Sequence, residues 1–233
     1  MAELAGKFAI ITGGLTEIGK YLAILFAKHG ADILLIDKSE TQLKLICKSN
    51  EKKISYFASD ITKDENIKKI IEYVKEKYGK IDILVNNSNF CFSQSLIELR
   101  MVDYDKMFNI TVRTLVNMTI ECLPLIIKSK GNILNVSNMG IITNSPRYSM
   151  YLGAKAAIDN FTKCWALDLK EDNVRVNSIG FKLTEGIKFY YEEKEKDKVD
   201  INECIGEMAL SLVNNNSTIT GENAYIEKFL EIE

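Results

Sequence analysis

Short, almost entirely apolar segments alternate along this chain with segments in which apolar residues recur every three or four positions. The apolar segments predict six strands, at residues 8–11, 33–36, 54–58, 83–85, 133–136 and 174–179. Strands of nearly uniform apolar composition are typical of a parallel sheet that is buried on both faces. The order of elements therefore predicts an α/β fold, a Rossmann-like doubly wound parallel sheet flanked by helices.

The segments between the predicted strands have the spacing of amphipathic helices. Residues 18–26 and 67–78 are two examples, and Ser39 with Gln42 and Thr62 with Glu65 form capping boxes that would begin two helices. No linker, internal repeat or low-complexity segment divides the chain, so we expect a single domain over residues 1–233. A charged segment at residues 190–200 is expected to be a solvated helix or loop over the sheet.

The composition argues against several classes of function. The 233 residues carry 30 Lys and Arg against 32 Asp and Glu, a net charge of -2, and no basic block, so nucleic acid is not an expected partner. The apolar stretch 115–127 is interrupted by Asn117, Glu121 and Pro124, which argues against a membrane span. The first six residues lack the features of an export signal, and a cytoplasmic location is expected.

Cysteine and histidine chemistry is also restricted. The five cysteines are scattered and nowhere spaced as a metal or redox motif, so we expect reduced thiols and no metal site. The single histidine, His29, ends an apolar helical pattern, where a capping role is the simpler interpretation. Hydrolase chemistry that needs a serine–histidine or cysteine–histidine pair would have to use that one residue.

A tyrosine and a lysine four residues apart share one face of a helix and can move a proton. The ammonium favours the phenolate and lowers the tyrosine pKa from its ordinary value of about 10. Three pairs have this spacing: Tyr73 with Lys77, Tyr151 with Lys155, and Tyr190 with Lys194. Only Tyr151 opens the helix after the fifth predicted strand, at the carboxyl end of the sheet where α/β folds bind ligands. We therefore predict that Tyr151 and Lys155 are the catalytic pair.

A glycine-bearing turn follows the first predicted strand and leads into a helix. Residues 12–19 read Thr-Gly-Gly-Leu-Thr-Glu-Ile-Gly, and turns of this type present backbone N–H groups and a positive helix end to a diphosphate. Asp37 ends the second predicted strand, where a carboxylate would bind the ribose hydroxyls of NAD and repel the additional phosphate of NADP. Lys38 beside it keeps NADP as the second choice.

Together these features resemble the short-chain dehydrogenase/reductase family over nearly the whole chain. The matching motifs are the glycine turn, Asp60 in Ala-Ser-Asp-Ile, Asn86-Asn87, Tyr151 with Lys155, and residues 175–177 and 219–221. The resemblance implies that Asp60 holds the adenine, that Tyr151 exchanges the proton and that Lys155 also contacts the nicotinamide ribose. It implies these cofactor-binding residues: Gly13, Glu17, Ile18, Gly19, Asp37, Asp60, Ile61, Asn87, Tyr151 and Lys155. It further implies a homodimer or homotetramer, a small-molecule substrate, and a substrate-loop segment near 184–202.

The chain departs from the family pattern at Glu17, which replaces the middle glycine of the turn. A carboxylate about 4 Å from a diphosphate would cost about 1 kcal/mol in water and about 4 kcal/mol at an effective dielectric of about 20. If the side chain instead turns outward, its negative charge is stabilised by the positive end of the helix. The sequence leaves both orientations open.

Three other family positions carry altered side chains. The catalytic asparagine of the family falls on Thr111, whose hydroxyl can still order a water molecule. The family serine falls on Asn138 without a gap, or on Ser137 if one residue is missing before Tyr151, and such neighbours point to opposite faces at a strand end. Asn89 replaces a glycine, tolerates a left-handed turn, and places a side chain in the cofactor groove.

Two functions are therefore predicted. The first is an NAD-dependent oxidoreductase that interconverts an alcohol and a carbonyl, with Tyr151 exchanging the proton and Asn138 or Ser137 holding the substrate oxygen. The alternative is a degenerate relative that keeps the fold and acts as a non-catalytic nucleotide-binding, regulatory or assembly protein. Saturable binding of NADH would favour the first, and the altered residues at one end of the sheet motivate the second.

Overall fold

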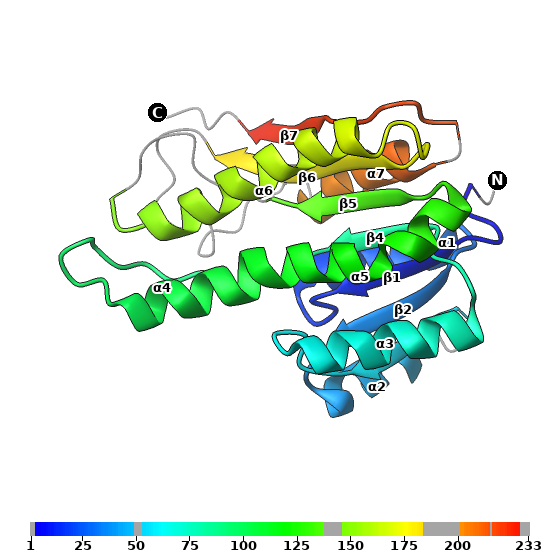
Figure 1. Cartoon of the computed structure of the whole chain (residues 1–233), viewed down its shortest axis with the longest axis horizontal. Helices are drawn as coiled ribbons and strands as arrows, with labels where there is room; N and C mark the ends of the chain where they lie inside the picture. Colours follow the sequence, from blue (N-terminus) through cyan, green and yellow to red (C-terminus); the bar gives the residue numbers. More distant parts are fainter. Residues whose placement is uncertain (1–2, 49–52, 138–145, 184–200, 215, 229–233) are drawn as a thin grey trace, which may run out of the picture.

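The computed structural model describes residues 3–48, 53–137, 146–183, 201–214 and 216–228, which form one seven-stranded parallel sheet flanked by helices. The strands lie in the order β3-β2-β1-β4-β5-β6-β7 (Figure 1). They are β1 (Phe8–Thr12), β2 (Asp32–Asp37), β3 (Ile54–Ala58), β4 (Ile83–Asn86), β5 (Asn132–Val136), β6 (Arg175–Leu183) and β7 (Asn223–Lys228). The helices are α1 (Glu17–Lys28), α2 (Glu40–Lys48), α3 (Asp64–Lys77), α4 (Met101–Phe108), the π-helical η1 (Asn109–Arg113), α5 (Thr114–Ser129), α6 (Ser149–Asp168) and α7 (Ile201–Val213).

All six predicted strands are present, and the sheet is parallel throughout, as predicted. The sequence prediction missed β7, and it ended β6 at residue 179 although the strand continues to Leu183. In the described sheet β7 is an edge strand that pairs only with β6, and its residues alternate between polar and apolar instead of forming an apolar run. The left-handed Gly221 (φ 77°), two residues before the strand, is the signal that could have located it.

Neighbouring side chains of a strand point to opposite faces, and each face of this sheet carries its own layer of helices. On β1, Ala9 and Ile11 belong to a core cluster with residues of α1, α2 and α7. Phe8 and Ile10 belong to a second cluster, with residues of α3, α5 and α6. Figure 1 shows α3, α5 and α6 in front of the sheet and α7 behind it. Because full burial of one such aliphatic side chain contributes about 1.5–3 kcal/mol, the two clusters fix the strands between the layers.

The strand order reverses between β1 and β4. The chain passes from β1 to β2 and β3 on one side of the sheet, and then places β4 to β7 on the other side. β1 and β4 pair directly, with Ala9 opposite Ile83 and Ile11 opposite Val85. The loops after such a pair lead to opposite faces, which opens a crevice at the carboxyl ends of the strands. Ligands of doubly wound folds bind in this crevice.

A long helical segment, Met101–Ser129, joins α4, η1 and α5. Its α5 part packs against β4 and α3, whereas α4 projects beyond the ends of the strands (Figure 1). By length and apolar composition alone the segment is long enough to cross a membrane, a criterion that core helices of folded domains also meet. Pro124 lies inside α5 without ending the helix.

Two sequence expectations need correction or lie beyond the described residues. Thr62 does not cap α3, because the N-cap is Lys63 and the Thr62 hydroxyl donates to Oδ1 of Asp60 at 2.7 Å. The capping-box prediction is wrong here because the Thr62 hydroxyl and backbone N–H both donate to the carboxylate of Asp60. These charge-assisted hydrogen bonds hold Thr62 in the loop before the helix. Most of the predicted substrate-loop segment near 184–202, including the charged run, lies outside the described residues, and positions 201 and 202 begin α7.

Candidate functional site

The turn between β1 and α1 depends on its glycines. Gly13 is left-handed (φ 63°), and a Cβ atom there would lie 2.9 Å from the carbonyl oxygen of Asn87. Thr16 is the N-cap of α1: its hydroxyl accepts from the Gly19 N–H and donates to the Gly13 carbonyl, each at 3.0 Å. A Cβ atom at Gly19 would collide with that same carbonyl oxygen. The turn thus aims the N-terminus of α1 at the crevice, the arrangement that binds anions.

Asn87, directly after β4, holds the glycine turn from the other side of the crevice. Its side-chain amide donates to the carbonyl oxygens of Thr12 and Gly13 at 3.1 and 3.0 Å, and lies 2.8 Å from the Thr16 hydroxyl. Its backbone N–H donates to the Thr12 hydroxyl at 2.9 Å. The side chain is buried and does not line the cavity described below. Asn87 therefore positions the turn, and its place in the list of predicted cofactor-binding residues stays a prediction.

Asp37 ends β2 beside the glycine turn. Its Oδ2 accepts from the Leu15 N–H at 3.1 Å and its Oδ1 from the Lys38 N–H at 2.7 Å. The Lys38 ammonium is paired elsewhere, with Nζ 3.1 Å from Oδ1 of Asp60. Partial burial acts to raise the pKa of Asp60, but hydrogen bonds from Thr62 and Lys38 outweigh it and hold that pKa below its ordinary value. The ends of β2 and β3 thus carry two carboxylates and one paired cation.

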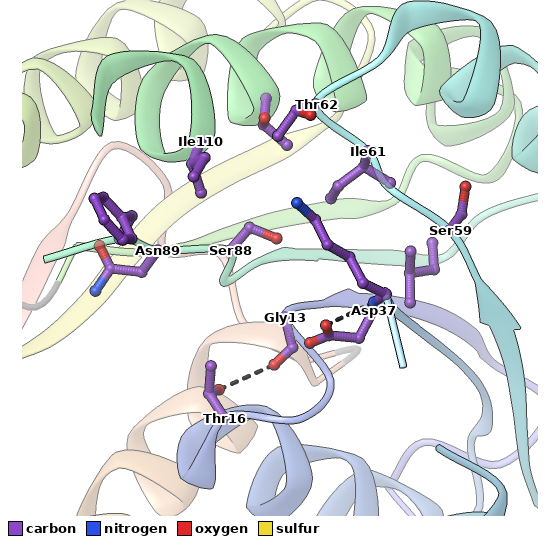
Figure 2. A pocket seen from close by; sticks show the side chains of 13 residues that line it. Gly13, Thr16, Asp37, Ser59, Ile61, Thr62, Ser88, Asn89 and Ile110 are labelled. Atoms are coloured by element: carbon purple, nitrogen blue, oxygen red, sulfur yellow. Dashed lines mark hydrogen bonds between the residues drawn. The ribbon is translucent and has the colours of Figure 1, made fainter. Parts of the chain in front are cut away.

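A cavity of about 220 Å³ lies between the glycine turn and the ends of β2, β3 and β4 (Figure 2). Gly13 and Asp37 line one side of it, and Ile61, Asn89 and Ile110 line the opposite sides. Whole small-molecule sites have volumes of about 300–1,000 Å³, so this cavity suits one part of a dinucleotide. Its lining combines apolar side chains with several hydroxyl groups, the Asp37 carboxylate and Lys38, which suits a base and its ribose hydroxyls.

Asn89 matches one expectation and differs from another. Its side chain lines the cavity, as the sequence predicts. Its backbone is not left-handed, because the only described non-glycine residues with positive φ are Lys130, Arg147 and Asn173. The loop after β4 therefore takes a path that needs no glycine at this position.

Glu17 is the first residue of α1, is exposed, and does not line the cavity. Of the two orientations that the sequence leaves open, the structure therefore favours the outward one. There an acidic side chain gains about 0.3–1 kcal/mol from the positive end of the helix. Ile18 packs against the core cluster of α1 and α7. Neither side chain is part of the cavity wall.

Tyr151 and Lys155 lie on the buried face of α6 and are 7% and 1% exposed. Nζ of Lys155 is 5.5 Å from the centre of the Tyr151 ring and donates to the Val136 carbonyl at 3.2 Å. Burial lowers the pKa of the Lys155 ammonium to about 7, and Asp159 and Cys91 oppose that shift. The pair is therefore held in a low-polarity setting with a group that titrates near neutral pH, as proton-transfer sites require.

The other two tyrosine–lysine pairs differ in setting. Lys77 donates to the hydroxyl of Tyr73 at 2.8 Å, but Lys77 is exposed and the Tyr73 ring packs against the second core cluster, beside Phe57. Tyr190 and Lys194 lie outside the described residues. Among the described pairs, Tyr151 with Lys155 alone is buried beside the end of β5.

Thr111 is fully buried in the π-helical segment η1. Its hydroxyl accepts from the Phe90 N–H at 3.2 Å and lies 3.5 Å from the Phe90 carbonyl oxygen. The neighbouring Thr114 donates to the Asn109 carbonyl twice, through its backbone N–H in the wider π-helical turn and through its hydroxyl at 2.8 Å. Thr111 thus ties the long helix to the loop after β4, and its predicted role in ordering water stays a prediction.

Ser137, directly after β5, is fully buried, and its hydroxyl has no hydrogen-bond partner among the described residues. Asn138, the other candidate for the family serine, lies outside the described residues. Ser137 follows Asn135 by two positions and so shares its face of the strand, the face on which Asn135 donates to Thr162 of α6 at 2.9 Å. The Ser137 hydroxyl therefore faces α6.

Sequence reasoning missed two residues of this region. Thr16 could have been found, because a threonine directly before a helical pattern is a typical N-cap. Cys91, whose charge acts on Lys155, could not, because it lies in the irregular loop after β4. Within the described ranges no three His, Cys, Asp or Glu side chains are grouped so as to hold a metal ion.

Comparison with known proteins identifies the family. The family model for short-chain dehydrogenases matches residues 7–189. The 3-oxoacyl-acyl-carrier-protein reductase FabG of Thermotoga maritima is 34% identical over 181 residues, which cover 76% of this chain and 74% of that protein. Oxidoreductase UcpA of Escherichia coli is 35% identical over 184 residues, covering 77% and 70%. The crystal structure of Cj0485 dehydrogenase matches with a TM-score of 0.82 and 26% identity, over 97% of this chain and 94% of that one. Since these matches span most of the chain, the protein belongs to the short-chain dehydrogenase/reductase family and is an oxidoreductase.

Proposed function

We propose that the protein is an NAD-dependent oxidoreductase that interconverts a small alcohol and its carbonyl compound, with Tyr151 as the proton donor or acceptor. The observation that carries the proposal is a shared edge. The cavity beside the glycine turn, which Asp37 lines, and the buried Tyr151–Lys155 pair both lie at the carboxyl ends of the parallel strands. One extended molecule can therefore reach the nucleotide end and the proton donor together.

The residues at this edge suit a dinucleotide. The close approach of Gly13 and Gly19 to neighbouring backbone leaves the N-terminus of α1 open to a diphosphate. Asp37 lines the cavity where ribose hydroxyls would lie. The bound cofactor would supply or accept the hydride, which no side chain of the protein can do.

The chain itself would supply the proton chemistry. In the direction of reduction, the phenol of Tyr151 gives its proton to the carbonyl oxygen as the hydride adds to the carbon. The Lys155 ammonium, 5.5 Å from the Tyr151 ring, stabilises the phenolate that forms. Ser137 or Asn138 would be the donor that holds the substrate oxygen, and the Ser137 hydroxyl faces α6, the helix that carries Tyr151.

The charges around Asp37 support NAD over NADP. The carboxylate would repel a ribose phosphate, and the nearby Lys38 ammonium is paired with Asp60. We expect wild-type protein to favour NADH, and Asp37→Asn to raise kcat/KM for NADPH relative to NADH by about tenfold or more, an effect of about 1.4 kcal/mol. The measurement is steady-state oxidation of each reduced nucleotide, with small ketones and a short 3-oxoacyl thioester as test substrates.

Asp32→Asn is the matched control for this substitution. Asp32 is the first residue of β2 and Asp37 is the last. Asp32 therefore lies at the amino end of the strand, opposite to the cavity, where it pairs with Lys53. Its replacement should leave the nucleotide preference unchanged. A wild-type preference for NADPH, or a ratio that does not respond to Asp37→Asn, would contradict the assignment.

A further inference from the structure

A buried polar cluster lies behind Lys155 and takes no part in the proton transfer proposed above. Its centre is Asp159, one turn of α6 beyond Lys155 on the same buried face and 8% exposed. The Ser178 hydroxyl, from β6, lies 3.2 Å from Oδ1 of Asp159 and 2.9 Å from Oδ1 of Asn223. The side-chain amide of Asn223, from β7, donates to the backbone carbonyl of Asp159 at 3.4 Å. Groups of β6 and β7 therefore converge on Asp159 of α6, a residue that is almost wholly removed from water.

Two enclosed hydroxyl groups complete the cluster. The Tyr225 phenol and the Ser137 hydroxyl are buried, and neither has a regular hydrogen-bond partner within the described ranges. Burial raises the pKa of Tyr225 and Asp159 raises it further, while Ser137 and Ser178 act in the opposite direction. The phenol therefore stays neutral and can solvate the carboxylate without neutralising it. A buried carboxylate is tolerated only where such donors or a cation face it.

The groups that face Lys155 come from each neighbouring element. Val136, at the end of β5, accepts the hydrogen bond from Nζ, and Tyr151 presents its ring from the same helix. Asp159 and, in its thiolate form, Cys91 in the loop after β4 are the groups whose charges act on the ammonium. Burial raises the pKa of the Cys91 thiol, which keeps it neutral at pH 7. The hydroxyl and amide groups of β6 and β7 gather around Asp159 and are neutral. Among the described residues that act on Lys155, Asp159 is thus the only carboxylate.

We propose that Asp159 is a positioning residue of the active site, whose carboxylate, held by the polar groups of β6 and β7, keeps the Lys155 ammonium charged beside Tyr151. The inference rests on the proposed function, because the charge on Lys155 matters to turnover only if Tyr151 exchanges the proton. It deepens that function by naming Asp159 as the negative charge that balances the Lys155 ammonium, a residue outside the Tyr151–Lys155 motif.

The physical reason is the balance between burial and charge. Burial disfavours the ammonium, and a fixed negative charge one helical turn away in the same low-polarity interior favours it. With the carboxylate present, the pKa of Lys155 lies at about 7. Without it, the pKa would fall below neutrality and Lys155 would be mostly uncharged at pH 7. The phenolate of Tyr151 would then lose the cation that stabilises it.

The direct test is the titration of Lys155 in the full chain without cofactor. Competitive labelling of lysines with acetic anhydride, from about pH 5 to about pH 10 and read by peptide mass spectrometry, gives the pKa of this amine. Asp159→Asn keeps the side-chain shape and removes the charge. We expect it to lower the pKa of Lys155 by about one unit or more, a tenfold change in the ratio of charged to neutral amine. An unchanged pKa would overturn the proposal.

Two further variants separate charge from packing. Asp159→Glu keeps a carboxylate and should restore the wild-type pKa of Lys155. Tyr225→Phe removes a neutral member of the same cluster and should leave that pKa within about 0.3 unit of the wild-type value. If Tyr225→Phe lowers it as much as Asp159→Asn does, the effect comes from disturbed packing and the proposal fails. In active protein, Asp159→Asn should also shift the alkaline limb of the kcat profile to lower pH, because Lys155 would lose its charge at a lower pH.

A second measurement serves if Asp159→Asn does not fold. In wild-type protein labelled with ¹³C-aspartate, the Asp159 carboxyl resonance should show a step near pH 7 as Lys155 loses its proton. The absence of that step would equally overturn the proposal. Neither titration requires turnover or bound nucleotide. A protein that fails to bind NADH but shows these shifts would refute the proposed function alone, and an active enzyme without them would refute only the role of Asp159.

Discussion

Tyr151→Phe is expected to lower kcat for carbonyl reduction by about a thousandfold, while the Kd for NADH stays within about twofold of the wild-type value. The change removes one hydroxyl and keeps the ring that packs on the buried face of α6 beside Lys155. A positioned general acid contributes about 10²- to 10⁴-fold to a rate, and it acts in the transition state instead of in cofactor binding. Steady-state kinetics and calorimetric NADH titration on the same preparations measure both quantities.

Tyr73→Phe is the matched control, because Tyr73 has the same spacing to a lysine and accepts a hydrogen bond from Lys77 at 2.8 Å. Its ring packs against Phe57 and Tyr78, away from Tyr151, so the loss of its hydroxyl alone should leave kcat unchanged. If Tyr151→Phe retained full activity, the proton would have to come from another group. If both variants lost activity equally, the effect would reflect helix stability and not acid catalysis.

Lys155→Met is expected to abolish turnover and yet to raise the free energy of unfolding at pH 7 by about 2 kcal/mol. Burial lowers the pKa of this ammonium from 10.5 to about 7, a difference of 3.5 units that corresponds to about 5 kcal/mol of destabilisation of the charged form. Part of that gain is lost, since the Val136 carbonyl loses its donor and Asp159 loses its cation. Urea unfolding followed by circular dichroism measures the remainder.

The pH dependence identifies the cause of this stabilisation. Between pH 7 and pH 10.5 the unfolded chain binds more protons at Lys155 than the folded chain does, so wild-type stability rises with pH in that window. Below pH 7 both states are charged and the destabilisation is complete. The advantage of Lys155→Met should therefore be largest at neutral or lower pH and should fall away toward pH 10.5. Lys77→Met, at an exposed lysine, should show no such gain. A difference that does not change with pH would contradict this explanation.

The fold was largely predictable because the strands are buried on both faces. Such strands appear in the sequence as short apolar runs, and their alternation with amphipathic helices leaves few possible topologies. The edge strand β7 lacks this pattern, because Asn223, Glu227 and Lys228 make half of its positions polar. The start of α3 was misplaced because Asp60 competes for the Thr62 hydroxyl, a contact that depends on the path of the loop.

The site was predictable where chain order alone determines position. Asp37 and Tyr151 follow from the rule that ends of parallel strands meet at one edge. The hydrogen bonds of Asn87 and Thr111 did not follow, because each joins segments that are distant in sequence. In the sequence Asp159 looks like an ordinary helix residue, because its contacts with Ser178 of β6 and Asn223 of β7 exist only in the folded chain. Buried polar contacts of this kind are products of the tertiary fold.

The most direct test of the central claim is a calorimetric titration of the wild-type protein with NADH. Binding of one NADH per chain with a micromolar Kd is the predicted result. Glu17→Gly should change that Kd by less than about threefold, because the Glu17 side chain is exposed at the start of α1. Absence of binding at millimolar NADH would contradict the claim and would favour a family member that has kept the fold without the cofactor.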